Sequence, residues 1–290
     1  MSVATELYLN NKFHFSKGVA VSVTASAGSA TEAGYNIAWV QDMNQFEGWK
    51  GPNGTADFNI LVDGLVNTWL NSSATGTIYW AVTYDARSSD QTLLRLKSDA
   101  ADSSGGAFAE AVTTMALDTT GPGLSVATFS LSALRRYYKV QLLNSDRGGT
   151  NRTPLITSMY FGLLGSDVFL VDSSWPGISY GGGEITLIGN YADSFMVGGH
   201  TYPVKTGRPL QEFELNFLPQ SPSMWETIRD DLDALAVNNS AFLVRFDGMK
   251  AYSRSDFVMV RVNAERWGSE RRNVALHRSV LPLRTVAQPV

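Results

Sequence analysis

The sequence predicts a mainly β protein, built from a jelly-roll β-sandwich and a second β-sandwich that carries one flanking α-helix. The first 180 residues consist of short segments of alternating apolar and polar residues, separated by turn-forming Gly, Ser, Asn and Asp. The later part also alternates, but residues 223–236 have a clear 3.6-residue apolar period. With 290 residues, 44% hydrophobic and 17% charged, the chain has enough material for two packed domains.

The first region predicts a series of short strands. Val19, Val21 and Val23 alternate with small or polar residues, and this pattern recurs along the chain. The predicted strands are 19–24, 58–62, 77–84, 92–97, 126–131, 136–143 and 155–164. Short strands interrupted this regularly are typical of a sandwich or jelly roll.

The second region predicts the order strand, helix, strand, strand. Residues 212–218 alternate as a half-buried strand does. A capping box, Ser223 with Glu226, then begins the helix, and Asn239 ends it. The side chains expected on the apolar face of this helix are Trp225, Ile228, Leu232 and Leu235. Strands are expected at 241–246 and 257–262, joined by a turn around Gly248.

The domain boundary is expected in a Gly-rich stretch. The predicted organisation is N-terminal strands at 1–25 that could join the second (ring) domain, a galactose-binding-like jelly roll at 26–172, a linker at 173–183, the second sandwich at 184–270 with helix 223–236, and a basic arm at 271–290.

Composition excludes several classes of function. The chain has no Cys, so disulfides, thiolate metal sites and thiol nucleophiles are absent. The three His residues, His14, His200 and His277, are far apart in sequence, so no metal site and no cofactor are expected. A net charge of −4 does not favour nucleic acid, and no apolar run is long enough for membrane insertion. Residues 1–17 lack the pattern of a signal peptide, so synthesis in the cytosol is expected.

One short stretch of the sequence matches a known catalytic motif. Residues 177–181, GISYG, match the nucleophile elbow G-x-S-x-G, with Ser179 as the serine. The elbow needs a strand before the serine and a helix after it, but residues 182–188 predict a loop leading into a strand. We therefore interpret this stretch as a Gly-rich loop between domains and expect no enzyme activity.

Acidic residues offer two further hypotheses. Carboxylate pairs next to aromatic residues could serve glycoside hydrolysis, and loop oxygens could hold calcium. The carboxylate pairs are Asp42 with Glu47 and Asp85 with Asp90, and the calcium candidates are Asp42, Asn44 and Glu47, or Asp99 and Asp102. Acidic turn residues are the commoner explanation of the carboxylate pairs, and no contiguous calcium loop is present.

Aromatic residues suggest a sugar-binding surface. The first region contains Trp39, Trp49, Trp69 and Trp80, all beside predicted strands. Exposed rings stack on sugar faces, whereas buried rings build a core, and the core is the default interpretation. The ligand-binding candidates are Trp39, Trp49 and Tyr84.

The C-terminal thirty residues are rich in arginine. The residues expected to bind a partner subunit are Arg271, Arg272, Arg278 and Arg284. Pro282 and Pro289 argue against a central strand and favour an edge strand or an extended arm. A solvated tail is the alternative interpretation, and either way the monomer is expected to fold without residues 271–290.

Two segments resemble known families. Residues 36–143, with WVQDMNQFEGWK, FNILVDGL, TIYWAVTYDA and RYYKVQLLNS, resemble the galactose-binding-like jelly roll of many carbohydrate-binding modules. Residues 205–262, with QEFELNFLPQ, SMWETIRDDLDALA and AFLVRFDG, resemble the sandwich with a flanking helix of tail-tube and distal-tail (tail hub) proteins of long-tailed bacteriophages.

The second resemblance implies a structural virion protein of a phage tail tip. It implies a hexameric ring that links the tail tube to the receptor-binding apparatus, assembles in the host cytoplasm, and contacts tube, hub and receptor-binding proteins. The alternative is a carbohydrate-binding adhesion module without catalytic activity, whose partner is a cell-surface glycan.

Overall fold

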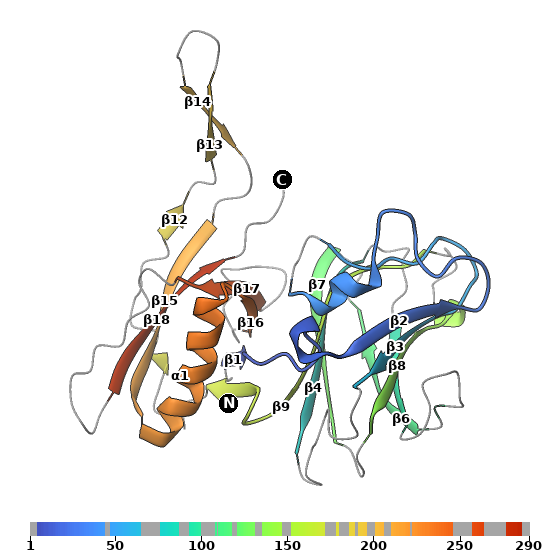
Figure 1. Cartoon of the computed structure of the whole chain (residues 1–290), viewed down its shortest axis with the longest axis horizontal. Coiled ribbons are helices and arrows are strands. Elements are labelled where there is room, and N and C mark those ends of the chain that lie inside the picture. Colours follow the sequence, from blue (N-terminus) through green and yellow to red (C-terminus); the bar gives the residue numbers. More distant parts are fainter. Residues whose placement is uncertain are drawn as a thin grey trace. The chain divides into compact units, whose positions relative to one another are not determined.

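The chain forms two units in the computed structural model (Figure 1). One unit combines Met1–Leu9 with Phe169–Val290, and the other, Asn10–Val168, is inserted between these two segments. The structure describes residues 5–43, 47–64, 76–86, 93–99, 108, 110–117, 121–130, 135–146, 152–171, 178–179, 186–188, 191–195, 201–205, 210–220, 222–245, 257–263 and 277–285. We call the two parts the split unit and the inserted unit.

The boundaries of the two units differ from those expected for residues 1–25. Strand β1 (Thr5–Tyr8) belongs to the split unit and pairs with β16 (Ala241–Arg245), more than 230 positions later in the chain. Strand β2 (Ala20–Ala25) belongs to the inserted unit and pairs with β3 (Phe58–Asp63). The predicted N-terminal segment is thus divided between the units, because β1 and β2 each belong to the unit that contains their pairing partner.

The inserted unit consists of antiparallel sheets. The five-stranded sheet has the order β2–β3–β8–β5–β6, with β8 (Tyr137–Leu142), β5 (Leu93–Asp99) and β6 (Glu110–Ala116). The three-stranded sheet has the order β7–β4–β9, with β7 (Gly121–Phe129), β4 (Ile78–Ala86) and β9 (Leu155–Leu163). Short 3-10 helices occur at η1 (Phe15–Lys17), η2 (Ile37–Gln41) and η3 (Asn144–Asp146). The predicted mainly β, sandwich class is confirmed.

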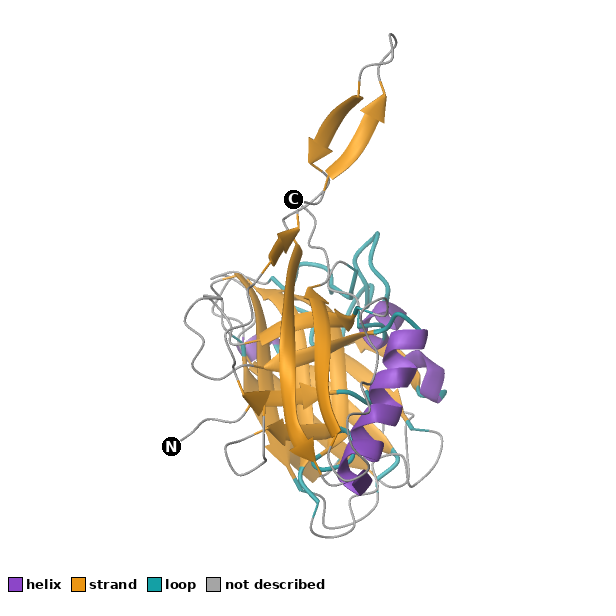
Figure 2. Cartoon of the chain, turned by 90° about the vertical axis from the view of Figure 1, so that its left-hand side faces the viewer, coloured by secondary structure: helices purple, strands orange, loops and turns teal. Residues whose placement is uncertain are grey.

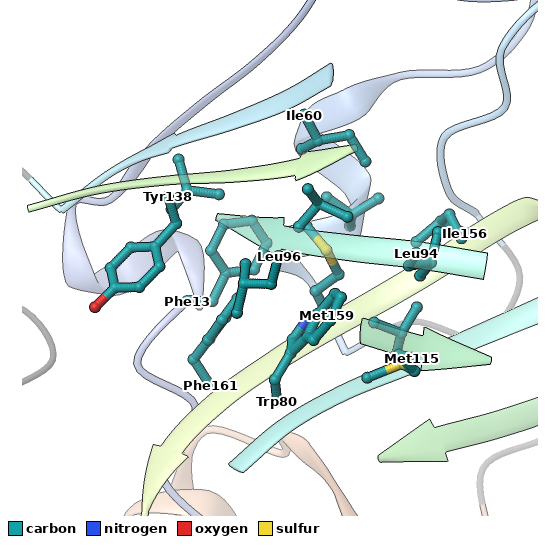
Figure 3. Packing of buried hydrophobic residues seen from close by; sticks show 14 of the residues in the cluster. Phe13, Ile60, Trp80, Leu94, Leu96, Met115, Tyr138, Ile156, Met159 and Phe161 are labelled. Atoms are coloured by element: carbon teal, nitrogen blue, oxygen red, sulfur yellow. The ribbon is translucent and has the colours of Figure 1, made fainter. Parts of the chain in front are cut away.

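Alternating burial in these strands builds the core. In β3 and β8, every second side chain is buried. Figure 3 shows the rings at its centre: Trp80 stacks on Phe161 with centroids 6.3 Å apart, and Phe13 meets Phe161 edge-on at 5.9 Å. Aliphatic and sulfur-containing side chains from both sheets, including Ile60 and Met159, fill the space around them.

A buried amide ties the beginning of the inserted unit to β9. Asn11 Oδ1 accepts the N–H of Phe13 at 3.0 Å and the N–H of Phe161 at 3.2 Å. Its Nδ2 donates to the carbonyl of Met159 at 3.0 Å. The backbone N–H of Lys12 donates to the carbonyl of Phe161 at 2.8 Å. One side chain therefore satisfies buried main-chain groups of two distant segments.

Asp167 is a second buried polar side chain with several partners, and it lies at the end of the inserted unit. It accepts hydrogen bonds from Asn10 Nδ2 at 3.0 Å and from the N–H of Leu163 at 2.8 Å, and Lys12 Nζ lies 3.2 Å from Oδ1. The carboxylate is fully buried, so this compensation is required for its charge. The two ends of the insertion are thus held next to each other.

The split unit is an eight-stranded sheet with a helix beside it (Figure 2). The order of the sheet is β10–β1–β16–β17–β18–β15–β11, and β12 also pairs with β15. The remaining strands are β10 (Val168–Val171), β11 (Ile178–Ser179), β12 (Thr186–Ile188), β15 (Leu210–Gln220), β17 (Phe257–Val262) and β18 (His277–Thr285). Strands β13 (Tyr191–Phe195) and β14 (Thr201–Lys205) form a separate two-stranded sheet.

The predicted helix is confirmed as α1 (Pro222–Val237), which packs against β17. Leu232 is fully buried, whereas Asp230 on the opposite side is exposed. Asn239, with φ of 49°, ends the helix: its N–H donates to the carbonyl of Ala236, and the next N–H returns to Leu235. This is the Schellman arrangement, in which the left-handed residue satisfies the last carbonyls of a helix.

Strand β18 corrects the predicted C-terminal arm. Residues 277–285 are neither an edge strand nor a tail, because β18 lies between β15 and β17, with Leu281 and Leu283 buried. Pro282 is tolerated because the ladder to β17 covers only Leu283–Thr285, so the missing N–H can face the side where that ladder has ended. The expectation that the chain folds without residues 271–290 is therefore withdrawn.

We predict that Leu232→Ala lowers the free energy of unfolding of the split unit by about 2–5 kcal/mol, through lost transfer energy and a cavity. Val237→Ala is the matched control, because Val237 lies on the same helix and is 85% exposed. Chemical denaturation should separate the two variants. Equal stability of both would mean that this face of α1 does not contact the sheet.

We predict that Asn11→Ala destabilises the inserted unit by about 2–4 kcal/mol, because two buried N–H groups lose their acceptor. Asn53→Ala, at an exposed position, should have little effect. Hydrogen exchange provides a local measurement: the amide protons of Phe13 and Phe161 should lose protection first. Unchanged protection of both amides would contradict the role given to Asn11.

Candidate functional site

The outer surface of the five-stranded sheet presents an ordered set of polar side chains. Because every second residue of β3, β8 and β5 points into the core, the residues between them point outward. We call these nine residues the polar face: Asn59, Leu61 and Asp63 from β3, Tyr137, Lys139 and Gln141 from β8, and Arg95, Lys97 and Asp99 from β5. All nine are half-buried.

Strand register arranges the polar face in three rows. The first row is Asn59, Gln141 and Arg95, the second is Leu61, Lys139 and Lys97, and the third is Asp63, Tyr137 and Asp99. Residues opposite each other in such rows have Cβ atoms about 4.5–5.5 Å apart, and successive rows are about 7 Å apart. Side chains within a row can therefore contact the same ligand group.

The first row contains an oriented amide pair. Gln141 Nε2 donates to Asn59 Oδ1 at 3.0 Å. Among the described residues, this is the one hydrogen bond of either side chain, so Asn59 Nδ2 and Gln141 Oε1 remain available. The pair therefore presents a donor and an acceptor side by side in fixed positions.

Two bidentate ion pairs border the polar face. Arg95 donates to both carboxylate oxygens of Asp146 at 2.9 Å, and Arg136 donates to both oxygens of Asp63 at 2.6 and 2.9 Å. The hydrogen bonds to these carboxylates raise the pKa of each guanidinium. Arg136 also lies over the ring of Tyr137, 4.8 Å from its centroid. These contacts fix the side chains at the edges of the polar face.

The second row contains two lysines directly opposite each other. Lys97 and Lys139 are cross-strand partners in the ladder of β5 and β8. Lys139 Nζ lies 4.4 Å from the centroid of the Phe108 ring, which is fully buried. Burial lowers the pKa of Lys139, and the neighbouring charge of Lys97 lowers it further.

The structure corrects two of the three aromatic candidates. Trp49 is 0% exposed; its ring meets Phe58 edge-on and its indole N–H donates to the carbonyl of Ala30 at 3.1 Å. Tyr84 is 2% exposed and belongs to the core. Neither ring face is open to a sugar. Burial of large aromatic side chains is the ordinary outcome in a sandwich core.

Trp39 remains accessible, since it is half-buried in η2. Trp80 lies in the core, and Trp69 is outside the described residues. One exposed ring was not predicted: Phe15 in η1 is 60% exposed and lies 4.2 Å from the ring of His14. No pattern in the sequence distinguishes Phe15 from a core residue.

The acidic candidates do not form a metal site in the described part of the chain. Asp42 and Glu47 are both exposed, and Asn44, Asp90 and Asp102 lie outside the described residues. Nowhere among the described residues do three His, Asp or Glu side chains gather closely enough to hold a metal ion. The described helices include none with the length and apolarity needed to cross a membrane.

The remaining serine and histidine candidates lie in different parts of the chain. Ser179 is in β11, opposite Asn216 of β15, and the next described element is strand β12 and not the helix that an elbow needs. His277 is in the split unit and His14 in the inserted unit, while His200 is outside the described residues.

Of the four arginine candidates, two lie in β18 and two lie outside the described residues. Arg271 and Arg272 lie outside the described residues. Arg278 and Arg284 lie in β18, where Arg284 is exposed and opposite Glu212 on one side and Arg261 on the other. These two arginines therefore belong to the central sheet and not to a free arm.

The polar face itself was not predicted as a site. Its signal was present in the sequence, because the residues between the apolar positions of 58–62, 92–97 and 136–143 include amides and lysines. Alternation predicts that these side chains face outward, but only strand register places them in shared rows.

Comparisons with known proteins assign no family to this chain. No protein-family model matches the chain, and no curated protein matches it. Among solved structures, the chain is similar to the X-ray structure of chitosan-binding module 1 derived from a chitosanase/glucanase from Paenibacillus sp. IK-5. That likeness has 14% sequence identity and a TM-score of 0.34, and covers 53% of this chain and 98% of the module.

Proposed function

We propose that the inserted unit is a non-catalytic carbohydrate-binding module and that the polar face is its binding surface. The observation that carries the proposal is the amide pair of Asn59 and Gln141. A sugar presents neighbouring hydroxyl groups, each of which donates and accepts a hydrogen bond. The free Nδ2 donor and Oε1 acceptor of the amide pair match two such hydroxyls.

Rigidity of the polar face supports the same function. Binding to flexible side chains requires ordering them, which lowers affinity. Here the amides are bonded to each other, and Arg95 and Asp63 are each held by a bidentate partner. Strands beneath them belong to a sheet with a packed core. A ligand would therefore meet groups that are already in position.

Hydrogen bonding, and not ring stacking, would dominate this site. Arg136 lies over the ring of Tyr137, and the ring of Phe108 is fully buried beside Lys139. Trp39, which is half-buried, and Phe15, which is exposed, belong to η2 and η1 and not to the polar face. Stacking at these two residues would be a separate contribution.

The test is a glycan array probed with the full chain, followed by calorimetry on each glycan retained. Asn59→Ala and Gln141→Ala should each weaken binding about three- to tenfold, the value of one or two lost hydrogen bonds. Asn53→Ala, at an exposed amide outside the sheets, should bind as the unchanged protein does. A chain that retains no glycan, or variants that bind normally, would refute the proposal.

A second candidate function is a ring-forming structural subunit of a phage tail tip, with tail tube, hub and receptor-binding proteins as partners and the virion tail as location. Strands β13 and β14 support it, because they pair only with each other in the described part of the chain. An isolated two-stranded hairpin is marginally stable in water, so a contact with another subunit would stabilise it. Strand β10, at one end of the eight-stranded sheet, offers an edge for pairing.

We predict that under this second function the protein elutes in size-exclusion chromatography with a mass several times 31.6 kDa, six times for a hexamer. Replacing residues 191–205 by a short Gly-Ser linker should return it to a single-chain mass, because the contact of the hairpin is lost. Circular dichroism would check that the sheets remain folded. A single-chain mass for the unchanged protein would exclude self-assembly of the isolated chain.

A further inference from the structure

Two charged residues of the polar face have bidentate partners, whereas its two lysines have none in the described part of the chain. Arg95 is paired with Asp146, and Asp63 is paired with Arg136. In the described structure, neither Lys97 nor Lys139 has a carboxylate within ion-pair distance. Two uncompensated positive charges therefore lie side by side in the second row.

The cross-strand pairing of Lys97 with Lys139 costs the free protein stability. Like charges directly opposite each other on antiparallel strands destabilise the sheet. Part of the surface of Lys139 is also removed from water by the ring of Phe108, which weakens the solvation of its ammonium group. An anion placed between the two ammonium groups would remove the repulsion and replace the lost solvation.

Phe108 provides a second sign that this place is specialised. Its φ of 29° lies in the left-handed region, which is uncommon for a residue with a side chain. Its ring is nevertheless fully buried, outside the core cluster that the two sheets form, and beside the Lys139 ammonium. Unusual backbone conformations of this kind tend to occur at binding sites.

We propose that the polar face binds an acidic glycan, whose carboxylate lies between Lys97 and Lys139. The proposal rests on the carbohydrate-binding function proposed above and names its ligand class. Gln141 is two residues from Lys139 on the same face, so the amide pair is about 7 Å away, within the span of one sugar ring. The carboxylate thus pairs with the lysines while hydroxyls of the same sugar reach the amides.

The third row restricts the orientation of this ligand. Asp63 and Asp99 flank Tyr137 in that row. Their negative charges disfavour a carboxylate there, although Arg136 partly compensates that of Asp63. A sugar acid is therefore expected to lie across the first and second rows, with its charged group at the second.

The experiment compares acidic polysaccharides with their neutral counterparts. The probes are polygalacturonate, alginate and hyaluronate, each also in a carboxyl-reduced form, in which –COO⁻ is replaced by –CH₂OH. Binding of the full chain is measured by biolayer interferometry. At least one acidic probe should bind tenfold or more tightly than its reduced form, and this advantage should shrink as salt is added.

Lysine variants test the site itself. Lys97→Met and Lys139→Met should each lower affinity for the acidic probe about tenfold and leave affinity for neutral glycans unchanged. Lys97→Arg should retain most of the binding, and Lys17→Met, at an exposed lysine in η1, is the control for loss of one charge. Thermal unfolding would confirm that each variant is folded.

The outcomes separate this inference from the function on which it rests. If the chain binds neutral glycans as tightly as acidic ones, the inference is overturned and the carbohydrate-binding function stands. Preference for acidic probes that survives both lysine substitutions also overturns it, because the charge would then be recognised elsewhere. Absence of any glycan binding overturns both.

Discussion

Burial of two polar side chains, Asn11 and Asp167, is the constraint on which the inserted unit depends. An amide or carboxylate without partners in a core would cost several kcal/mol, so each must be matched by groups in a fixed position. Asn11 bonds main-chain groups of Phe13, Met159 and Phe161, and Asp167 bonds Asn10, Lys12 and Leu163. The chain can therefore enter and leave the insertion at neighbouring points, and the strands between them close into one packed unit.

The same strands that build the core also build the candidate site. Because side chains alternate across a strand, Ile60 and Val140 point inward while Asn59, Lys139 and Gln141 point outward from β3 and β8. The packed core on the inner side and the ladders between β3, β8 and β5 hold the outward groups in register. Recognition by the polar face would thus derive its precision from the packing on the other side of the same strands.

Several interpretations failed for one physical reason. Trp49 and Tyr84 are aromatic residues in or beside strands, a description that fits a sugar-binding ring and a core ring equally well; their environment in three dimensions places both in the core. Pro282 argued against a central strand, but β17 pairs only with residues beyond it, so the proline is accommodated. In each case the residue type alone does not determine the role of the residue, because its neighbours in three dimensions decide it.

The sequence by itself determined the class of the fold, the positions of most strands and the helix at 223–236, which the structure has at Pro222–Val237. These features come from local periodicity, which is complete within a short segment. Only the tertiary structure decided that Thr5–Tyr8 pairs with Ala241–Arg245, that β18 is central, and that Lys97 faces Lys139 while Asn59 faces Gln141. Pairing and register between distant strands depend on how the whole core packs, so no local pattern contains them.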